Sequence, residues 1–376
     1  MLIGVPRETA AGETRVAVTP ETAKKLKAQG HVIRVETAAG VAASVTDEAY
    51  TAAGAEITDR AGAFACDLVL KVRSPSADEL ALMKSGSNLV GMLNPFDRPG
   101  LEALAAAGLT SFALEAAPRT TRAQSMDVLS SQANIAGYKA VMIAADCYQR
   151  FFPMLMTAAG TVKAARVVVL GVGVAGLQAI ATAKRLGAVI EASDVRPSVK
   201  EQVESLGARF IDVPYETAEE KEAAVGVGGY AKPMPQGWLD RQKVEVARRV
   251  AAADIVISTA LIPGRAAPVL VTEEMVRSMK PGSVIVDLAA GKGPDGKGGN
   301  CPLSVADQTV VVHGVTIVGE TNLAARVGAD ASALYARNVL DFLKLVLTKE
   351  STFHVPMDDD IVAACLVTQG GDVKRK

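Results

Sequence analysis

The chain of 376 residues has few of the side chains that build metal sites and disulfide frameworks. Its four cysteines lie far apart without paired spacing, and none of its three histidines is near a cysteine in sequence. The cysteines are Cys66, Cys147, Cys301 and Cys365, and the histidines, which we interpret as structural, are His31, His313 and His354. This scarcity argues against a metal centre and against a disulfide-rich fold.

Net charge is also nearly absent. Lys plus Arg number 40 against 41 Asp plus Glu, so no global field favours nucleic acid or an anionic membrane. The N-terminal residues MLIGVPRE lack the basic start and long apolar core of a signal peptide. The most apolar stretch, from Val167, is broken by glycines and carries Gln178, which favours a buried strand and helix over a membrane span. We therefore expect a soluble, cytoplasmic protein with no nucleic-acid partner and no direct membrane insertion.

What the chain does have is length, with 49% hydrophobic residues, which is enough for two packed cores. Strand-like runs alternate with helical patterns, and this predicts parallel strands joined by crossover helices. The strand-like runs cover residues 2–5, 32–36, 67–72, 88–93, 111–116, 165–171, 189–194, 209–213, 254–260, 283–289 and 309–319. The predicted fold class is α/β, with two doubly wound parallel-sheet (Rossmann-like) domains joined by long helices.

Two long helical patterns set the domain boundaries. An apolar one covers residues 131–152 and ends before Pro153, and the other begins at Ala331, after the last strand-like run. Because they bracket the second series of strands, we expect the chain to leave the first domain and return to it. The predicted domains are 1–130 plus 325–376, and 131–324, which includes the interdomain helix.

The hexapeptide GVGVAG places Gly171, Gly173 and Gly176 directly after a strand-like run. In this spacing the first glycine permits a tight turn, the second lets a pyrophosphate approach the backbone, and the third lets the helix pack closely on the sheet. The N-terminus of that helix offers free N–H groups to phosphates. The motif predicts a dinucleotide site, and the alternative is a glycine turn in an α/β domain that binds no nucleotide.

Asp194 ends the next strand-like run. A carboxylate there can accept hydrogen bonds from both adenosine ribose hydroxyls and would repel a 2′-phosphate, so the preference should be NAD over NADP. Arg196 could tolerate that phosphate, and Asp194 could instead be a solvated surface carboxylate.

Together these motifs resemble the NAD(H)-binding first component of proton-translocating nicotinamide nucleotide transhydrogenase, in a superfamily shared with alanine dehydrogenase. The resemblance covers nearly the whole chain. It is carried by GVPRETAAGETRVAVTP, RAQSMDVLSSQANIAGY, GVGVAG, ASDVR, GGYAKPM, STALIPGRAAPVLVTEEMV and PGSVIVDLAA.

The resemblance implies an enzyme that transfers hydride directly between NADH and NADP bound on a partner subunit. The chain resembles the separately encoded alpha-1 type of subunit, which is active only with NADP-binding and membrane subunits. It implies a homodimer in the cytoplasm, peripheral to the inner face of the plasma membrane through those partners.

The resemblance also implies the residues of the site. Arg119, Gln124, Asp127 and Ser130 would hold the nicotinamide end, and Tyr230 would belong to a loop that closes over bound nucleotide. Arg119, Gln124, Asp127 and Tyr230 are the residues expected to act in hydride transfer. Further nucleotide contacts are expected from Ser125, Met126, Val174, Val195, Arg196, Gly229, Ala260 and Leu261. The alternatives are that Asp127 or Ser130 caps the following helix, and that residues 223–238 form an ordinary surface loop.

Two other functions remain open on the sequence alone. Arg15 and Lys71 match positions where alanine dehydrogenase holds a carboxylate and a carbonyl, which keeps reductive amination of pyruvate possible. Its catalytic histidine and aspartate, however, correspond here to Asn94 and to the Ala290–Gly291 region, which cannot transfer a proton near neutral pH. A non-catalytic NADH-binding protein is the second alternative. The chain also departs from the transhydrogenase pattern at GKGPDGKGGN, Gly291–Asn300, and the role of this insertion is left open.

Overall fold

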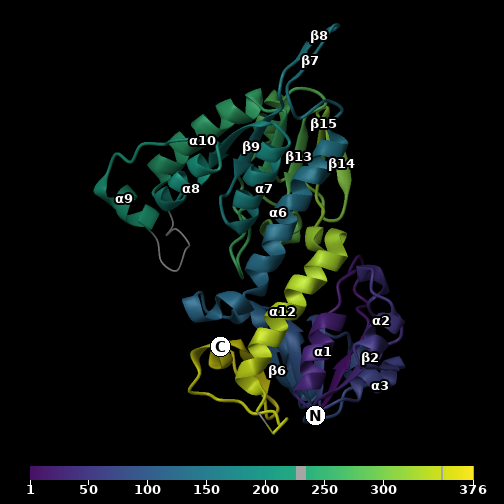
Figure 1. Ribbon diagram of the computed structural model, residues 1–376. Helices are drawn as coiled ribbons and strands as arrows, with labels where there is room; N and C mark the ends of the chain where they lie inside the picture. The colour runs from purple at the N-terminus through teal and green to yellow at the C-terminus, as the bar shows by residue number, and fades with distance from the viewer. Residues whose placement is uncertain (226–233, 349, 376) are drawn as a thin grey trace. The chain divides into compact units, whose positions relative to one another are not determined.

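The computed structural model describes residues 1–225, 234–348 and 350–375 of the chain. The chain divides into two compact units, which we call unit 1 and unit 2 (Figure 1). Unit 1 comprises Met1–Gln132 and Ala324–Lys376, so the two chain ends belong to the same unit, and unit 2 comprises Ala133–Leu323.

Unit 1 contains an eight-stranded sheet in the order β17-β16-β6-β5-β4-β1-β2-β3. Strands β1 to β6 are parallel to one another, whereas β16 is antiparallel to both β6 and β17. The strands are β1 (Leu2–Val5), β2 (Val32–Glu36), β3 (Glu56–Thr58), β4 (Leu68–Arg73), β5 (Asn88–Met92), β6 (Thr110–Ala113), β16 (Leu366–Gln369) and β17 (Asp372–Val373).

Helices cover both faces of this sheet, because the central strands are nearly continuous buried runs whose side chains point alternately to the two faces. On one face, Leu68 and Leu70 of β4 share a core with apolar residues of α1 and α12, and on the other, Val69 packs with Leu101 and Leu104 of α5. The helices are α1 (Pro20–Ala28), α2 (Asp47–Ala52), α3 (Arg60–Phe64), α4 (Ala77–Leu80), α5 (Arg98–Ala106), α12 (Gly328–Val346) and α13 (Asp360–Cys365), with 3₁₀ turns η1 (Val41–Ala43), η2 (Leu114–Ala116) and η3 (Thr121–Met126).

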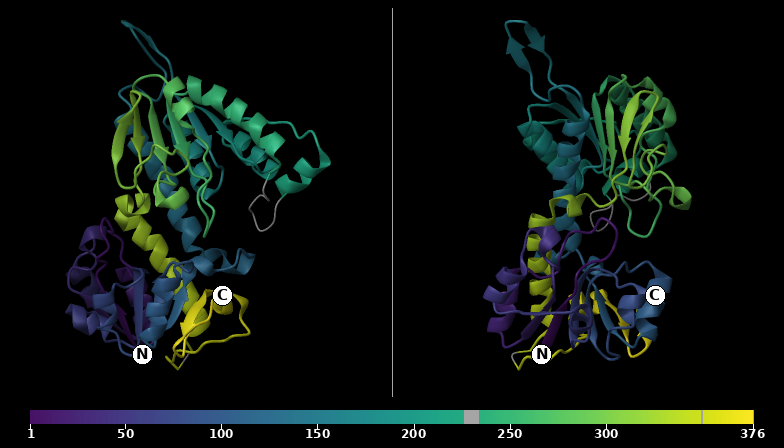
Figure 2. Two further views of the ribbon diagram at one scale, coloured as in Figure 1. Left: turned by 180° about the vertical axis from the view of Figure 1, so that it is seen from behind. Right: turned by 90° about the vertical axis from the view of Figure 1, so that its right-hand side faces the viewer.

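Unit 2 contains a seven-stranded sheet in the order β11-β10-β9-β12-β13-β15-β14, parallel except for the β14–β15 pair. A separate antiparallel hairpin, β7–β8, extends away from this sheet (Figures 1 and 2). The strands are β7 (Leu155–Thr157), β8 (Gly160–Val162), β9 (Arg166–Leu170), β10 (Val189–Ser193), β11 (Arg209–Phe210), β12 (Ile255–Ser258), β13 (Val284–Asp287), β14 (Thr309–Val312) and β15 (Val315–Val318).

The sheet of unit 2 is also covered on both faces. Val167 and Val169 of β9 pack with residues of α6, α7 and α8, whereas Val168 packs with residues of α10 and α11. The helices are α6 (Val128–Cys147), which begins in unit 1 and ends in unit 2, α7 (Val174–Arg185), α8 (Lys200–Ser205), α9 (Ala218–Val225), α10 (Gln236–Ala252) and α11 (Glu273–Ser278), with η4 (Pro197–Val199), η5 (Pro294–Gly296) and η6 (Leu323–Val327).

No helix within the three described ranges has the length and apolar character needed to cross a bilayer.

The predicted fold class is confirmed, but the expectation of a single strand over residues 309–319 is wrong. His313 and Gly314 both have positive φ, at 53° and 78°. This is the backbone of a tight two-residue hairpin turn, so the run forms two antiparallel strands. The expected strand at 209–213 is limited to Arg209–Phe210. Strand β3, the β7–β8 hairpin and the antiparallel strands β16 and β17 were not predicted from the sequence.

Candidate functional site

The three glycines of the hexapeptide GVGVAG, which we call the fingerprint, have different surroundings. Gly171 follows β9 with φ of 90°, and a Cβ there would meet Thr259 Oγ1 at 2.8 Å. A Cβ on Gly176 would lie 2.0 Å from the Gly171 carbonyl oxygen, whereas a Cβ on Gly173 would meet no heavy atom of the described residues within 4 Å. The first and third glycines are therefore required by the turn and its packing, and the second leaves open space beside the N-terminus of α7.

Asp194 lies at the end of β10, beside the same turn. Its Oδ2 accepts a hydrogen bond from Val172 N at 2.7 Å, which ties the carboxylate to the residue between the first two glycines. Arg196 donates from N and Nε to Oδ1 and from Nη2 to Oδ2, each at 2.9 Å, and also from Nη2 to the Val172 carbonyl at 3.1 Å. The Asp194 carboxylate thus sits at the fingerprint already paired with a guanidinium. The hydrogen bonds of the Val172 main chain with Asp194 and Arg196 were not predicted from the sequence.

The residues after β12 complete this edge of the sheet. Thr259 donates from Oγ1 to the Gly171 carbonyl oxygen at 2.8 Å, so this segment lies directly against the glycine turn. Ala260 follows, and the next residue, Leu261, is 46% exposed. Because β9, β10 and β12 are adjacent and parallel, their carboxyl ends meet here. The edge brings together Gly171, Gly173, Val174, Gly176, Asp194, Val195, Arg196, Ala260 and Leu261 of the predicted site.

The other predicted cluster lies in unit 1, at η3 and the start of α6. Asp127 caps α6, because its Oδ1 accepts from Ser130 N at 2.9 Å and its Oδ2 from Ser130 Oγ at 2.6 Å. The capping role weighed as an alternative is therefore present. It also fixes the carboxylate and hydroxyl side by side in one orientation.

Of the neighbouring residues, Gln124 and Ser125 are exposed, as is Arg119. The side chain of Met126 is only 7% exposed and packs in the core of unit 1. The Ser125 carbonyl accepts a hydrogen bond from Asn338 Nδ2 of α12 at 2.7 Å, which anchors η3. Gly229 and Tyr230, predicted for the closing loop, lie outside the described residues.

The two residues shared with alanine dehydrogenase have partners within unit 1. Lys71 is 1% exposed, and its Nζ lies 3.3 Å from both Glu8 Oε2 and Glu79 Oε2. Burial raises the pKa of the Glu8 carboxyl above its ordinary value, although Lys71 opposes this. The ammonium is therefore held between two carboxylates of the chain itself.

Arg15 is 3% exposed and donates to both oxygens of Glu13 and to Gln132 Oε1. Burial raises the pKa of Glu13, but its hydrogen bonds with Arg15 and the charges of Arg15 and Arg73 outweigh burial and lower it to about 2. Asn94, predicted to correspond to the dehydrogenase's histidine, is exposed with φ of 54°. Its carboxamide cannot donate a proton near neutral pH as that histidine would.

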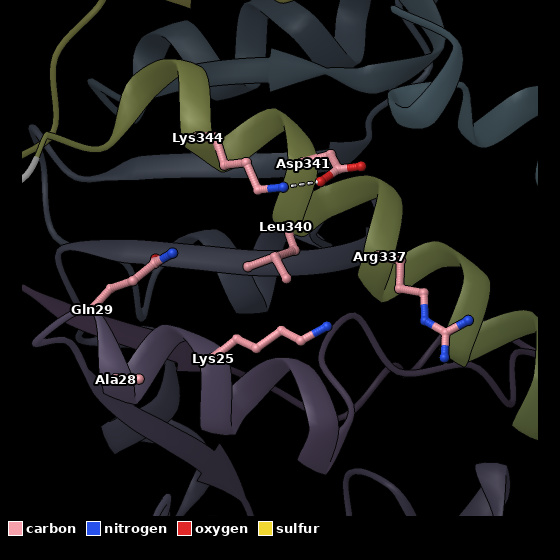
Figure 3. Close-up of a pocket in the computed structure, with 7 residues that line it drawn as sticks. All are labelled: Lys25, Ala28, Gln29, Arg337, Leu340, Asp341 and Lys344. Carbon is pink, nitrogen blue, oxygen red and sulfur yellow. Dashed lines mark hydrogen bonds and ion pairs between the residues drawn. The ribbon is translucent and has the colours of Figure 1, made fainter.

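A surface groove of unit 1 lies between α1 and α12 (Figure 3). Leu340 and Ala28 supply apolar surface, and Lys344 binds Asp341 at 2.5 Å. None of its lining residues belongs to the predicted site. Within the described ranges, no group of three or more His, Cys, Asp and Glu side chains could hold a metal ion.

Both halves of the chain match family models. Residues 4–136 match the alanine dehydrogenase/PNT N-terminal domain, and residues 140–376 match the alanine dehydrogenase/PNT C-terminal domain. The chain is 51% identical to an NAD(P) transhydrogenase subunit alpha chain of Rhodospirillum rubrum, over 99% of this chain and 97% of that protein. It is 30% identical to alanine dehydrogenase of Bacillus subtilis, over 99% of this chain and 92% of that one.

A solved structure agrees. The crystal structure of transhydrogenase from Sinorhizobium meliloti superposes with a TM-score of 0.89 at 47% identity, covering 99% of this chain and 100% of that chain.

Fold and site define a Rossmann-like α/β protein with a glycine-rich turn and an acidic residue at the adjacent strand end. The chain belongs to the alanine dehydrogenase/PNT family, and its greater identity to the transhydrogenase subunit places it with the transhydrogenase alpha subunits. The resemblance inferred from the sequence is confirmed.

Proposed function

We propose that this chain is the NAD(H)-binding subunit of a proton-translocating NAD(P) transhydrogenase and exchanges hydride with NADP(H) bound on a partner subunit. The observation that carries the proposal is the open space at Gly173 beside Asp194, in a chain 51% identical to a transhydrogenase alpha subunit. A phosphate bridge needs such a gap to approach backbone N–H groups at a helix N-terminus.

The residues at this edge fit a dinucleotide. Because the first-turn amides of an α-helix have no partner inside the helix, those of α7 can donate to phosphate oxygens. Asp194 would accept the adenosine ribose hydroxyls. Arg196 already binds both of its oxygens, which holds the carboxylate in place beside Val172. A negative carboxylate here disfavours a 2′-phosphate, and Arg196 reduces that penalty.

The cluster of unit 1 would hold the nicotinamide end. A carboxamide presents one acceptor and two donors, which suit a cation, a carboxylate and a hydroxyl. Arg119, Gln124, Asp127 and Ser130 supply these groups, with Ser125 beside them, and the Asp127–Ser130 hydrogen bonds orient two of them in advance. The bound nicotinamide supplies the transferable hydride. Because the transfer requires no proton, the lack of an acid at Asn94 is compatible with it.

The alanine dehydrogenase alternative is weaker. It needs Lys71 and Arg15 to turn toward a small oxo acid. However, Lys71 is bound by Glu8 and Glu79. Arg15 is bound by Glu13 and Gln132. Releasing Lys71 would take the ammonium from buried Glu8 and leave Glu79 with Arg60, and releasing Arg15 would leave buried Glu13 with Arg73, which is costly.

The NADP-binding and membrane subunits are the proposed partners, and through them the chain would lie at the inner face of the plasma membrane. We also propose a homodimer, with the β7–β8 hairpin seated on a second copy of the chain. Met156 lies in β7 and its side chain is 75% exposed, and Met154, directly before β7, is 59% exposed. An isolated two-stranded hairpin is marginal in water, and exposed apolar residues mark contact surfaces.

The test uses the purified full chain. NADH binding is first measured by nucleotide fluorescence, and NADH absorbance is then followed with pyruvate and ammonium, and separately with the NADP-binding and membrane subunits plus NADP. We expect NADH to bind and NADPH to be refused, with oxidation of NADH only when the partner subunits are present. Steady oxidation with pyruvate and ammonium would identify an amino-acid dehydrogenase, and binding without either reaction would favour a non-catalytic NADH-binding protein.

A further inference from the structure

Within the insertion Gly291–Asn300, the chain forms a loop whose two ends are hydrogen-bonded to each other. Gly291 N donates to the Gly298 carbonyl oxygen at 2.6 Å, and Gly293 N donates to the same oxygen at 3.3 Å. The chain thus returns to its starting point, and Gly299 follows beside Ala289. Residues 291–298 therefore leave Gly299 and Asn300 next to Asp287, at the carboxyl end of β13.

Asn300 is fully buried, and all of its carboxamide contacts go to one neighbouring segment. Its Oδ1 accepts from Ala260 N at 3.0 Å, and its Nδ2 donates to the carbonyl oxygens of Ala260 at 2.9 Å and Pro268 at 2.8 Å. Its main-chain carbonyl accepts from Leu270 N and Val271 N. One residue therefore ties together both ends of the loop 261–267, and we call these carboxamide hydrogen bonds the Asn300 clamp.

Asp287 holds Asn300 in place. This fully buried carboxylate accepts from Asn300 N at 3.3 Å and Cys301 N at 2.9 Å, and from the hydroxyl of Ser258 at 3.1 Å. A Cβ on Gly299 would lie 2.5 Å from Asp287 Oδ2, so the chain approaches the carboxylate as only glycine allows. Main-chain and hydroxyl donors bind both oxygens of Asp287, and this buried carboxylate therefore fixes the position of the Asn300 main chain.

The clamp acts on the edge that contains the fingerprint. Ala260 follows Thr259, whose hydroxyl binds the Gly171 carbonyl, and a Cβ on Gly171 would approach Ala260 N to 3.1 Å. Beyond Ala260, the loop exposes two large apolar side chains, Leu261 at 46% and Ile262 at 41%. In open α/β sheets ligands bind beyond the carboxyl ends of the strands, so this loop borders the proposed nucleotide position.

We propose that Asn300 is a positioning residue for nicotinamide nucleotide binding: its carboxamide fixes Ala260 and the loop 261–267 against the glycine turn, where their placement determines the affinity for NADH. This inference rests on the proposed function. It assigns a role to Asn300, the last residue of the insertion, in which residues 291–298 fold back on themselves.

The test compares a variant of Asn300, which binds the chain just after β12, with a variant of Asp254, which lies just before β12. Asn300→Asp is isosteric but cannot donate to the Ala260 and Pro268 carbonyls, and it adds a charge near Asp287. Asp254→Ala, the control, removes the carboxylate that binds Arg166 N and Lys280 at the amino end, away from the fingerprint. Dissociation constants for NADH are measured on the full chain well below each variant's melting temperature.

We expect Asn300→Asp to raise the NADH dissociation constant by about tenfold or more, equivalent to about 1.4 kcal/mol. Asp254→Ala should lower the melting temperature without changing that constant. If Asn300→Asp is not recovered folded, Asn300→Ser, which removes the carboxamide and adds no charge, should raise the NADH dissociation constant as well. A purely structural role would lower the melting temperature and leave the dissociation constant at the wild-type value, which would overturn the proposal.

Amide hydrogen exchange of the wild-type chain tests the clamp without any substitution. The Ala260 amide should exchange slowly before nucleotide is added, because Asn300 Oδ1 accepts its hydrogen bond. Rapid exchange there would overturn the clamp. Failure of the wild type to bind NADH would overturn the proposed function and this inference with it, whereas equal binding by wild type and Asn300→Asp would overturn this inference alone.

Discussion

A methyl group added at Gly176 should lower the stability of the chain, whereas one added at Gly173 should lower its affinity for NADH, although the two glycines are three residues apart in one motif. At Gly176 the new Cβ would lie 2.0 Å from the Gly171 carbonyl oxygen and 3.0 Å from its carbon, both main-chain atoms that cannot rotate away. Gly176→Ala must therefore move α7 relative to β9. Such overpacking costs about 1–3 kcal/mol, which corresponds to a fall of roughly 2–4 °C in melting temperature per kcal/mol for a domain of 150–250 residues.

At Gly173 the backbone has φ of -82°, which alanine adopts without strain, and the added Cβ meets no described heavy atom within 4 Å. Gly173→Ala should therefore keep the melting temperature of the nucleotide-free chain within about 1–2 °C of wild type, since a substitution that disturbs no packing is typically within about ±0.5 kcal/mol. The methyl would instead occupy the space that the pyrophosphate needs. We expect NADH affinity to fall by at least about tenfold, a loss of about 1.4 kcal/mol.

The assay is thermal unfolding followed by circular dichroism without nucleotide, combined with fluorescence titration of NADH. Wild-type NADH affinity in Gly173→Ala would refute the placement of the phosphates. An unchanged melting temperature in Gly176→Ala would refute the packing argument.

Four further predictions address other regions of the molecule. Asp194→Ala should weaken NADH binding and reduce discrimination against NADPH, measured as the ratio of the two dissociation constants; an unaltered ratio would remove Asp194 from the specificity site. Lys71→Met should destabilise the chain by about 3–5 kcal/mol in urea unfolding, because it removes the ammonium from buried Glu8 and leaves Glu79 with Arg60 alone as a cation; a loss below about 1 kcal/mol, the value of an exposed pair, would contradict this burial. The pKa of Glu13 is about 2 in the folded chain, below its ordinary 4.5, so its stabilising contribution is complete above 4.5 and is lost as pH falls toward 2; Glu13→Gln should flatten the stability profile in that window, and an unchanged slope would count against the pairing. Met156→Glu should shift the chain toward a monomer in sedimentation equilibrium without lowering NADH affinity, and an unaltered mass would argue against the hairpin as the contact between copies.

Much of the sheet edge at the carboxyl ends of β9 and β10 could be predicted because its requirements are local. The spacing of Gly171, Gly173 and Gly176 reflects a turn, a gap and a close contact within a single strand–helix junction, and the structure has each of them there. Asp194 follows from the same logic, since the ends of adjacent parallel strands meet at one edge. Arg196 was identified only as a residue that could tolerate a phosphate, and its bonds to both Asp194 oxygens depend on the fold of the turn.

Contacts between distant segments of the chain could not be predicted in this way. The short strands β16 and β17 have little periodicity of their own, and β16 forms because Leu366 pairs with Phe112 on β6. The two-residue turn at His313 and Gly314 depends on positive φ at a residue that usually avoids it, so the run looked like one strand.

By itself, the sequence determined the α/β alternation, the glycine turn and the family, because each is expressed in short segments whose residue order limits the backbone directly. Only the tertiary structure decided that Lys71 is enclosed by Glu8 and Glu79, and that Asn300 binds Ala260 across the carboxyl ends of β12 and β13. Glu8 is far from Lys71 in the chain, and Ala260 is far from Asn300. Their meeting depends on sheet order and burial, which turn ordinary polar side chains into anchors because an unpaired charge or amide in the interior is costly.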